Sequence, residues 1–207
     1  VKDCLLIYLE PAASSTAELV TELLFYFADK PDLSRFEASV LYAGIVLDTK
    51  NFIVQTGSRT FEAAATLRRS GADPGLVKQL FSEDFAITKA RADIIAKAEK
   101  YPGGFLLAVS SLTNLPEATV AIAQAADYLL LTYGATCSIV IANIDEETVV
   151  VSARSQGLIN MQILMEEIGG GGHHSVAGVQ LKNVNIHELK IKIIGLVKKQ
   201  MEENKPE

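Results

Sequence analysis

The chain has 207 residues, of which 49% are hydrophobic and 21% charged, an ordinary composition for a globular protein long enough to bury a core. Its formal net charge is −6, from 19 basic and 25 acidic residues. This balance argues against binding of long duplex nucleic acid, because proteins that do so carry a strongly basic surface. A small phosphorylated ligand needs only a few donors and is compatible with this charge.

The cysteines and the apolar stretches argue against a cysteine-ligated zinc site and against a membrane-spanning helix within these residues. Cys4 and Cys137 are far apart and form no C-x-x-C pattern, so we expect two reduced thiols rather than a zinc site. The longest uncharged stretch, residues 128–144, contains a glycine and is shorter than the roughly 20 apolar residues of a membrane-spanning helix. The sequence opens at Val1 on an apolar run, so we expect a piece of a longer protein.

The first half of the chain is predicted to be mainly helical. Residues 4–9 are nearly all apolar, which is typical of a strand buried on both faces. Ser15 and Glu18 have the S-x-x-E spacing of a capping box, in which the Ser side chain accepts from a backbone N–H and the Glu side chain reaches back. Further helices are expected over residues 34–47, 61–69 and 74–81.

The second half is predicted to mix strands and helices. Ser82 or Asp84 can cap a helix over residues 85–101, which has few large apolar side chains and is expected to bridge two lobes. Strands are expected at 105–110, 137–142, 148–154 and 176–181, and helices at 116–126, at 159–168 and from 185. The predicted fold class is α/β, with lobes 1–84 and 102–207 joined by the linker helix 85–101.

Two segments of the first lobe could carry chemistry. Asp48 ends an apolar run and precedes polar residues, so its carboxylate could hold a hard cation; the alternative is a simple turn cap. Ser58 or Thr60 can cap a helix whose N-terminal amides attract anions, and Arg59 could bind a phosphate there. The alternative for Arg59 is a solvated side chain on a capped helix.

Two segments of the second lobe could bind a ligand. One is the run of Gly169, Gly170, Gly171, Gly172 and His173. Glycines let a backbone approach a ligand and point its amides at an anion, and histidine adds a donor; the alternative is a plain helix-to-strand turn. The other segment is Arg154 and Ser155 at the end of a predicted strand, where the Arg could clamp a phosphate, stack on a base or simply be exposed.

These motifs, in this order, resemble the DHH superfamily of phosphodiesterases. The segments at residues 13–19, 44–52 and 56–63 resemble the later part of a DHH domain, and those at 152–155, 160–162 and 169–173 resemble the DHH-associated domain. The Gly–His segment marks the superfamily, whereas the DTKNF and RTFEA segments are most similar to the GdpP-type cyclic-di-AMP phosphodiesterases. The resemblance implies that residues 1–84 are the C-terminal part of a DHH domain and that residues 102–207 are the substrate-binding domain.

The resemblance also implies a site with two manganese ions. In the family the ligands come from an Asp-x-Asp segment with a His upstream, a second Asp, an Asp-His-His triplet and the Asp of the DTKNF segment. Only this last ligand has a counterpart here, Asp48, which is thereby implied to be catalytic and metal-binding. Arg154, Ser155 and residues 169–173 are implied to bind phosphate or base. Because the triplet and the other ligands are missing, we expect these 207 residues alone to be inactive.

The function implied by the resemblance is hydrolysis of cyclic di-AMP to linear pApA. The parent protein would be anchored in the bacterial cell membrane through parts outside this sequence, with these residues on the cytoplasmic face, and a homodimer is compatible with it. Two alternatives stay open. One is an oligoribonuclease or RecJ-like exonuclease that acts on short oligonucleotides, and the other is a non-catalytic nucleotide-binding module. Intact metal-binding segments upstream would indicate the enzyme, and their absence the binding module.

Overall fold

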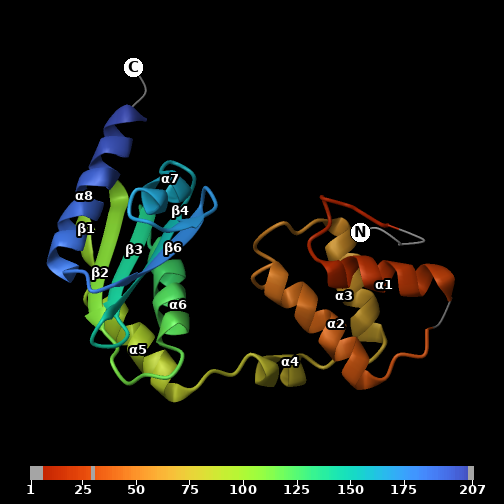
Figure 1. The fold of residues 1–207 in the computed structure, drawn as a ribbon. Coiled ribbons are helices and arrows are strands. Elements are labelled where there is room, and N and C mark those ends of the chain that lie inside the picture. Colours follow the sequence, from red (N-terminus) through yellow and green to blue (C-terminus); the bar gives the residue numbers. More distant parts are fainter. Residues whose placement is uncertain (1–6, 29–30, 205–207) are drawn as a thin grey trace. The chain divides into compact units, whose positions relative to one another are not determined.

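The structure is a computed structural model that describes residues 7–28 and 31–204. The chain divides into two compact units, Val1–Ser82 and Glu83–Glu207 (Figure 1). Among the described residues, none of the helices combines the length and apolarity needed to cross a membrane. The mixed α/β fold class predicted from the sequence is confirmed, and the strands of the described residues lie in the second unit.

The described part of the first unit consists of helices around a small apolar core. Its elements are α1 (Thr16–Phe27), α2 (Arg35–Asp48), α3 (Ser58–Arg69) and α4 (Pro74–Leu80). Ser15 caps α1 as predicted, because its side chain accepts from the backbone N–H of Glu18, and Ser34 forms a complete capping box with Glu37 in α2. The core residues are Ala38, Ile45, Ala63, Leu67 and Ala72.

The strand predicted over residues 4–9 is wrong where it can be compared. Cys4 and its neighbours up to residue 6 lie outside the described residues, while residues 7–9 form no strand, and the Ile7 and Leu9 side chains are 66% and 81% exposed. The described part of the first unit contains no sheet that an apolar strand could join. An apolar run alone therefore does not distinguish a buried strand from an exposed extended segment.

The second unit is built on a six-stranded sheet with strand order β1-β2-β3-β4-β6-β5. Strands β2 and β3 are parallel, and the other neighbouring strands are antiparallel, including the predicted hairpin of β3 and β4. The strands are β1 (Glu99–Tyr101), β2 (Phe105–Ser111), β3 (Cys137–Asn143), β4 (Thr148–Ser155), β5 (Gly171–Gly172) and β6 (Val176–Lys182), with a short 3-10 helix at Pro102–Gly104.

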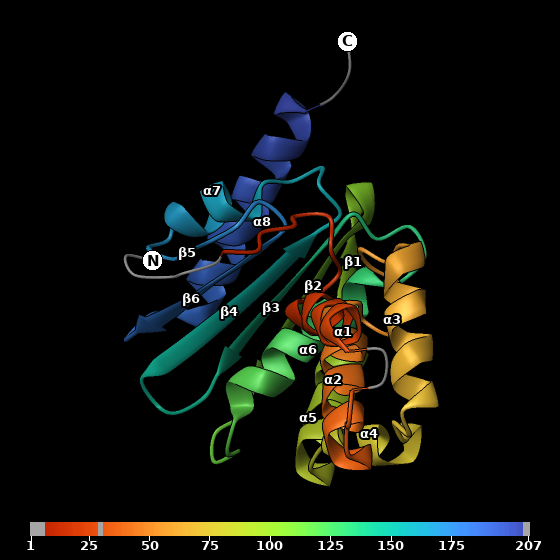
Figure 2. The ribbon, with the colours of Figure 1, turned by 90° about the vertical axis from the view of Figure 1, so that its right-hand side faces the viewer.

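Helices cover both faces of this sheet (Figure 2). Helices α5 (Phe85–Ala96) and α6 (Ala118–Leu130) pack on one face, and α7 (Met161–Glu166) and α8 (Ile186–Glu203) pack on the other. Side chains alternate between the faces along each strand. In β4, Val149, Val151 and Ala153 therefore join the core beneath α7 and α8, which places Arg154 on the face that α6 covers.

The helix expected to link the two lobes is part of the second unit. Residues Ile87, Ala90 and Ile94 of α5 are buried against α6, and the division between the units falls before the helix, after Ser82. The helix also ends earlier than predicted, because Glu99–Tyr101 form strand β1. Although the helix has few large apolar residues, Ile87, Ala90 and Ile94 are enough to bury one face of it in the core that it shares with α6.

Candidate functional site

The glycine run connects the end of α7 to strand β6, and most of its glycines are required by the fold itself. Gly169 follows α7 with φ +87°, a left-handed conformation that favours glycine. A Cβ on Gly170 would lie 2.5 Å from the carbonyl oxygen of Gly178, and one on Gly172 would lie 2.5 Å from Cα of Ala177. These close approaches let β5 pair with β6. The structure thus explains three of the four glycines by packing or backbone conformation.

Gly171 and the histidine that ends the run are the open part of this loop. Beyond Gly171 itself and its two chain neighbours, no heavy atom lies within 4 Å of the position that a Gly171 Cβ would take, so packing does not require glycine there. The side chains of His173 and His174 are exposed, while their backbone groups are fixed. The His173 N–H donates to the Val176 carbonyl at 2.7 Å, and the His174 carbonyl accepts from the Met161 N–H at 2.8 Å. The loop is therefore anchored at its backbone and open at its surface.

We expect alanine substitutions at two neighbouring glycines to differ in their effect on stability. Gly170→Ala should lower the free energy of unfolding by about 1–3 kcal/mol, because the added methyl group would collide with strand β6. Gly171→Ala should change it by no more than about 0.5 kcal/mol, because the methyl group enters open space. Denaturant unfolding of both variants checks this, and a large loss for Gly171→Ala would contradict the assignment of that position to the open surface.

Arg154 lies beside this loop, as its place in the sequence suggests. In the β4–β6 ladder Arg154 is opposite Val176, the first residue after the loop. Its side chain is only 10% exposed, and its Nε donates to the Asp127 carboxylate of α6 at 2.9 Å. The arginine is therefore neither freely solvated nor an open phosphate clamp, since a carboxylate already holds it. Asp127 could not be identified from the sequence, because the pair joins residues far apart in the chain.

Ser155 is buried and shapes the chain after β4. Its Oγ accepts from the N–H groups of Gly157 at 3.0 Å and of Ile159 at 3.2 Å, and its own N–H donates to the Ser175 carbonyl at 2.9 Å. Ser155 thus ties the end of β4 to the loop that carries the histidines. The predicted residues of the second lobe are brought together at one end of the sheet.

Asp48 is the last residue of α2, and its side chain is exposed. The turn after it is closed by the buried Thr49, whose Oγ1 donates to the Ile45 carbonyl at 2.7 Å and accepts from the Phe52 N–H at 2.9 Å. The alternative role for Asp48 was to cap this turn. Thr49 caps the turn instead. The carboxylate of Asp48 projects from a turn that the hydroxyl of its neighbour holds in place.

The turn after Thr49 has an unusual backbone. Lys50, Asn51 and Phe52 are consecutive non-glycine residues with φ of 47°, 61° and 64°, the left-handed region that such residues seldom adopt. The Phe52 ring stacks on Phe61 of α3, with ring centroids 5.5 Å apart. A run of this kind costs free energy and persists only where the surroundings enforce it, which is typical of functional sites.

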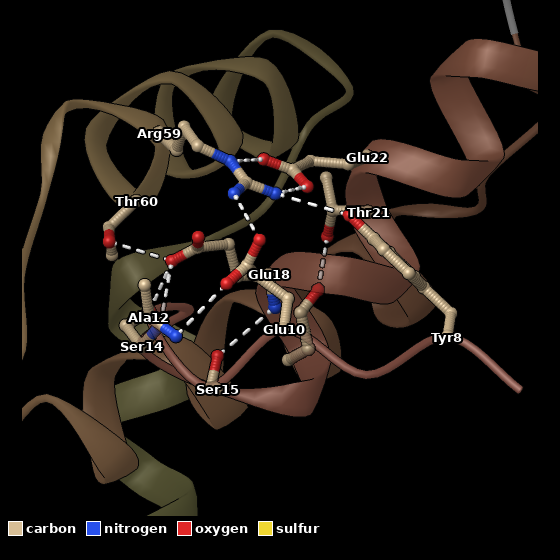
Figure 3. Close-up of polar contacts among 11 residues, drawn as sticks. Tyr8, Glu10, Ala12, Ser14, Ser15, Glu18, Thr21, Glu22, Arg59 and Thr60 are labelled. Atoms are coloured by element: carbon tan, nitrogen blue, oxygen red, sulfur yellow. Dashed lines mark hydrogen bonds and ion pairs between the residues drawn. The ribbon is translucent and has the colours of Figure 1, made fainter.

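Arg59 is held by acidic residues of its own unit (Figure 3). Its Nε and Nη2 donate to the two carboxylate oxygens of Glu22 at 2.8 and 2.5 Å, and Nη2 also donates to the Tyr8 hydroxyl at 3.3 Å. A bidentate pair of this geometry uses the edge of the guanidinium with which a phosphate would be gripped. Within the first unit, the structure thus brings Arg59 together with Glu22, a residue that the sequence analysis missed.

Glu18 belongs to the same cluster, but its role differs from the predicted capping box (Figure 3). The carboxylate is buried and accepts from the Ser14 hydroxyl at 2.5 Å, the Ser14 N–H at 3.2 Å and the Thr60 hydroxyl at 2.7 Å. It therefore ties α1 to the start of α3. Burial by itself raises the pKa of Glu18, but the hydrogen bonds from Ser14 and Thr60 outweigh burial and leave the pKa below its usual value.

This lowered pKa predicts a pH dependence of stability. The stabilisation by ionised Glu18 is fully present above the unfolded pKa, about 4.3, and is lost as the pH falls through the lower folded pKa. Glu18→Gln should lower the free energy of unfolding at pH 7 by about 1–3 kcal/mol and flatten its decline in acid. Urea unfolding of both proteins between pH 3 and pH 7 checks this, and parallel pH curves would contradict it.

Metal-ligating side chains are sparse in the part of the chain that the structure describes. Within residues 7–28 and 31–204, no cluster of three or more His, Cys, Asp or Glu side chains could hold a metal ion. Cys137 is buried, and burial raises its pKa to about 12, so it stays a thiol. Asp48 has the right chemistry for one ligand of a hard cation, since its carboxylate is exposed on a fixed turn. It fits as one member of a larger site.

Relatives of known function align with most of the chain. Residues 107–203 match the DHHA1 domain family. Over 192 residues the chain is 45% identical to cyclic-di-AMP phosphodiesterase PdeA of Listeria monocytogenes, covering 93% of this chain and 29% of that protein. Over 202 residues it is 44% identical to cyclic-di-AMP phosphodiesterase GdpP of Geobacillus thermodenitrificans, covering 98% of this chain and 30% of that protein. The chain thus spans about 30% of the length of these relatives.

A solved structure shares the fold. An exopolyphosphatase-related protein from Bacteroides fragilis matches with a TM-score of 0.77 and 20% sequence identity, covering 95% of this chain and 60% of that chain. At this identity the likeness shows the fold alone. The family match and the sequence relatives confirm the resemblance drawn from the motifs. Residues 107–203 belong to the DHHA1 domain family, and more than nine tenths of the chain is similar to cyclic-di-AMP phosphodiesterases of the GdpP and PdeA type.

Proposed function

We propose that this chain is part of a manganese-dependent phosphodiesterase that hydrolyses cyclic di-AMP to linear pApA. The observation that carries the proposal is the loop of the DHHA1 domain, where Gly171 is not required by packing and His173 is exposed on a fixed backbone. A ligand that approaches the backbone closely accounts for both features. Similarity to two cyclic-di-AMP phosphodiesterases supports the choice of ligand.

In this proposal the two units have separate tasks. The backbone amides and His173 of the loop bind the dinucleotide, with Arg154 beside them and Ser155 holding the end of β4 to the loop. Asp48 contributes one carboxylate to the metal site from the first unit. A pair of bound divalent ions would supply an activated water and offset the charge that develops on the phosphodiester. Hydrolysis adds one water across one P–O bond of the ring and leaves a terminal phosphate.

Hydrolysis assays on two proteins test the proposal. The full-length protein, incubated with cyclic di-AMP and manganese, should release linear pApA. The 207-residue chain alone should release none, because Asp48 by itself cannot hold a pair of cations roughly 3.5–4 Å apart. Equal turnover by both proteins would contradict the assignment of Asp48 to a larger site. Faster cleavage of short oligoribonucleotides than of cyclic di-AMP by the full-length protein would contradict the substrate.

The placement of the parent protein is proposed from the resemblance. We propose that other segments anchor it in the bacterial cell membrane and that the units described here face the cytoplasm. Fractionation of cells that produce the full-length protein should place it in the membrane pellet. Recovery of the full-length protein in the soluble fraction would contradict the anchor without affecting the proposed chemistry.

A further inference from the structure

The least expected contact near the loop is the ion pair of Asp127 and Arg154, which joins α6 to β4. The Arg154 side chain is 10% exposed and that of Asp127 is 43% exposed, so the pair lies at the edge of the buried interior. Arg154 Nε donates to Asp127 Oδ1 at 2.9 Å, and Nη2 lies 3.4 Å from Oδ2. The carboxylate thus faces the Nε–Nη2 edge of the guanidinium.

The other edge of the guanidinium is also engaged. Arg154 Nη1 donates to the Ser152 hydroxyl at 2.9 Å and to the Ala153 carbonyl at 3.0 Å. A guanidinium has five N–H groups, so these contacts with described residues leave one N–H, on Nη2. Neither edge retains the two parallel donors with which arginine grips a phosphate. The neighbouring carboxylate also repels a second anion.

We infer that Asp127 is a positioning residue for nucleotide binding: it holds Arg154 so that the single remaining Nη2 N–H donates to a neutral acceptor of the ligand, a base nitrogen or a ribose oxygen. The inference rests on the proposed function and deepens it. The register supports the location, since Arg154 is opposite Val176, directly after the loop with His173 and His174. In this arrangement the loop amides and His173 bind the phosphates, and Arg154 donates a hydrogen bond to the nucleoside.

Holding Arg154 in place should strengthen ligand binding because arginine has a long, flexible side chain. A free arginine must be ordered when the ligand binds, and ordering one such side chain weakens binding by about two- to tenfold. An arginine already fixed by the carboxylate avoids this loss. We therefore expect Asp127→Ala to weaken cyclic di-AMP binding by about two- to tenfold and Arg154→Ala to weaken it by about tenfold.

A double-mutant cycle tests the inference. Calorimetric titration of cyclic di-AMP into the full-length protein without manganese compares wild type, Asp127→Ala, Arg154→Ala and the double variant. If Asp127 acts through Arg154, the double variant should bind as weakly as Arg154→Ala alone. Equal losses from Asp127→Ala in both backgrounds would overturn the inference. Tighter binding by Asp127→Ala would also overturn it, because the aspartate would then compete with the ligand for the arginine.

A salt series and an asparagine variant test two further parts of the inference: the neutral acceptor for Arg154 and the hydrogen bond from Arg154 to Asp127. The affinity ratio of wild type to Arg154→Ala should be the same at low and high salt; a ratio that shrinks markedly at high salt would show a phosphate contact and overturn the neutral acceptor. Asp127→Asn keeps an acceptor for Arg154 Nε, so it should fold even if Asp127→Ala does not, and it should bind cyclic di-AMP more tightly than Asp127→Ala. A folded Asp127→Asn protein that binds as weakly as Arg154→Ala would overturn the inference that a hydrogen bond from Arg154 to Asp127 orients the arginine. Wild-type protein that does not bind cyclic di-AMP would overturn both this inference and the proposed function, whereas binding unaffected by Asp127 variants would overturn this inference alone.

Discussion

Replacing Asp48 with alanine in the full-length protein should lower the turnover of cyclic di-AMP by at least about a hundredfold and leave the fold intact. The expected loss is large because a metal ligand contributes several kcal/mol to transition-state stabilisation, and each 1.36 kcal/mol corresponds to a factor of about ten. The fold should survive because Thr49, not Asp48, makes the hydrogen bonds that close the turn after α2. Turnover, manganese affinity and thermal unfolding are the three measurements.

Glu62→Ala is the matched control for Asp48→Ala. Glu62 is also an exposed carboxylate of the first unit, in α3, and no role in catalysis is proposed for it. It should change neither turnover nor manganese affinity. If Asp48→Ala and Glu62→Ala were equally active, Asp48 would be an ordinary surface residue, and no residue of this chain would remain assigned to the proposed metal site.

Replacing His173 with alanine should weaken cyclic di-AMP binding by about ten- to a hundredfold in the absence of manganese. Loss of one hydrogen bond to a charged group costs about 1.5–3 kcal/mol, which corresponds to this range. Stability should be unaffected, since the side chain is exposed and the N–H that binds Val176 is retained in alanine. His187→Ala, at the exposed start of α8, is the control and should bind as wild type does. Equal affinities of both variants would remove His173 from the binding surface.

The sequence predicts local structure well where periodicity and capping coincide. Ser15 and Asp84 cap the first turns of their helices as predicted, and the hairpin of β3 and β4 follows from two β-rich runs separated by polar residues. Such patterns act within a few residues, so one sequence is enough to identify them. Residues 7–9 form no strand, and the helix predicted over residues 85–101 ends at Ala96 and packs within the second unit. Whether an apolar run or a weak apolar face is buried depends on what packs against it, which the run itself does not show.

The candidate site shows the same limit. Motif order places Arg154, Ser155 and residues 169–173 together, and the β4–β6 ladder confirms that they meet at one end of the sheet. The residues that decide how each side chain can act come from distant segments. Glu22 holds Arg59 and Asp127 holds Arg154, and both contacts depend on how helices pack against the rest of their unit. Side-chain pairing of this kind has no signature in the spacing of residues along one chain.

The most direct test of this account is to locate bound cyclic di-AMP on the chain. The 207-residue chain, labelled with ¹⁵N, can be titrated with cyclic di-AMP while the backbone amide resonances are followed by NMR. The account predicts that the largest shifts fall on Gly171, His173 and the residues around Arg154, with no comparable group of shifts in α1 to α4. A ligand that leaves these resonances unchanged up to millimolar concentration, or that shifts a different surface of the DHHA1 domain, would contradict it.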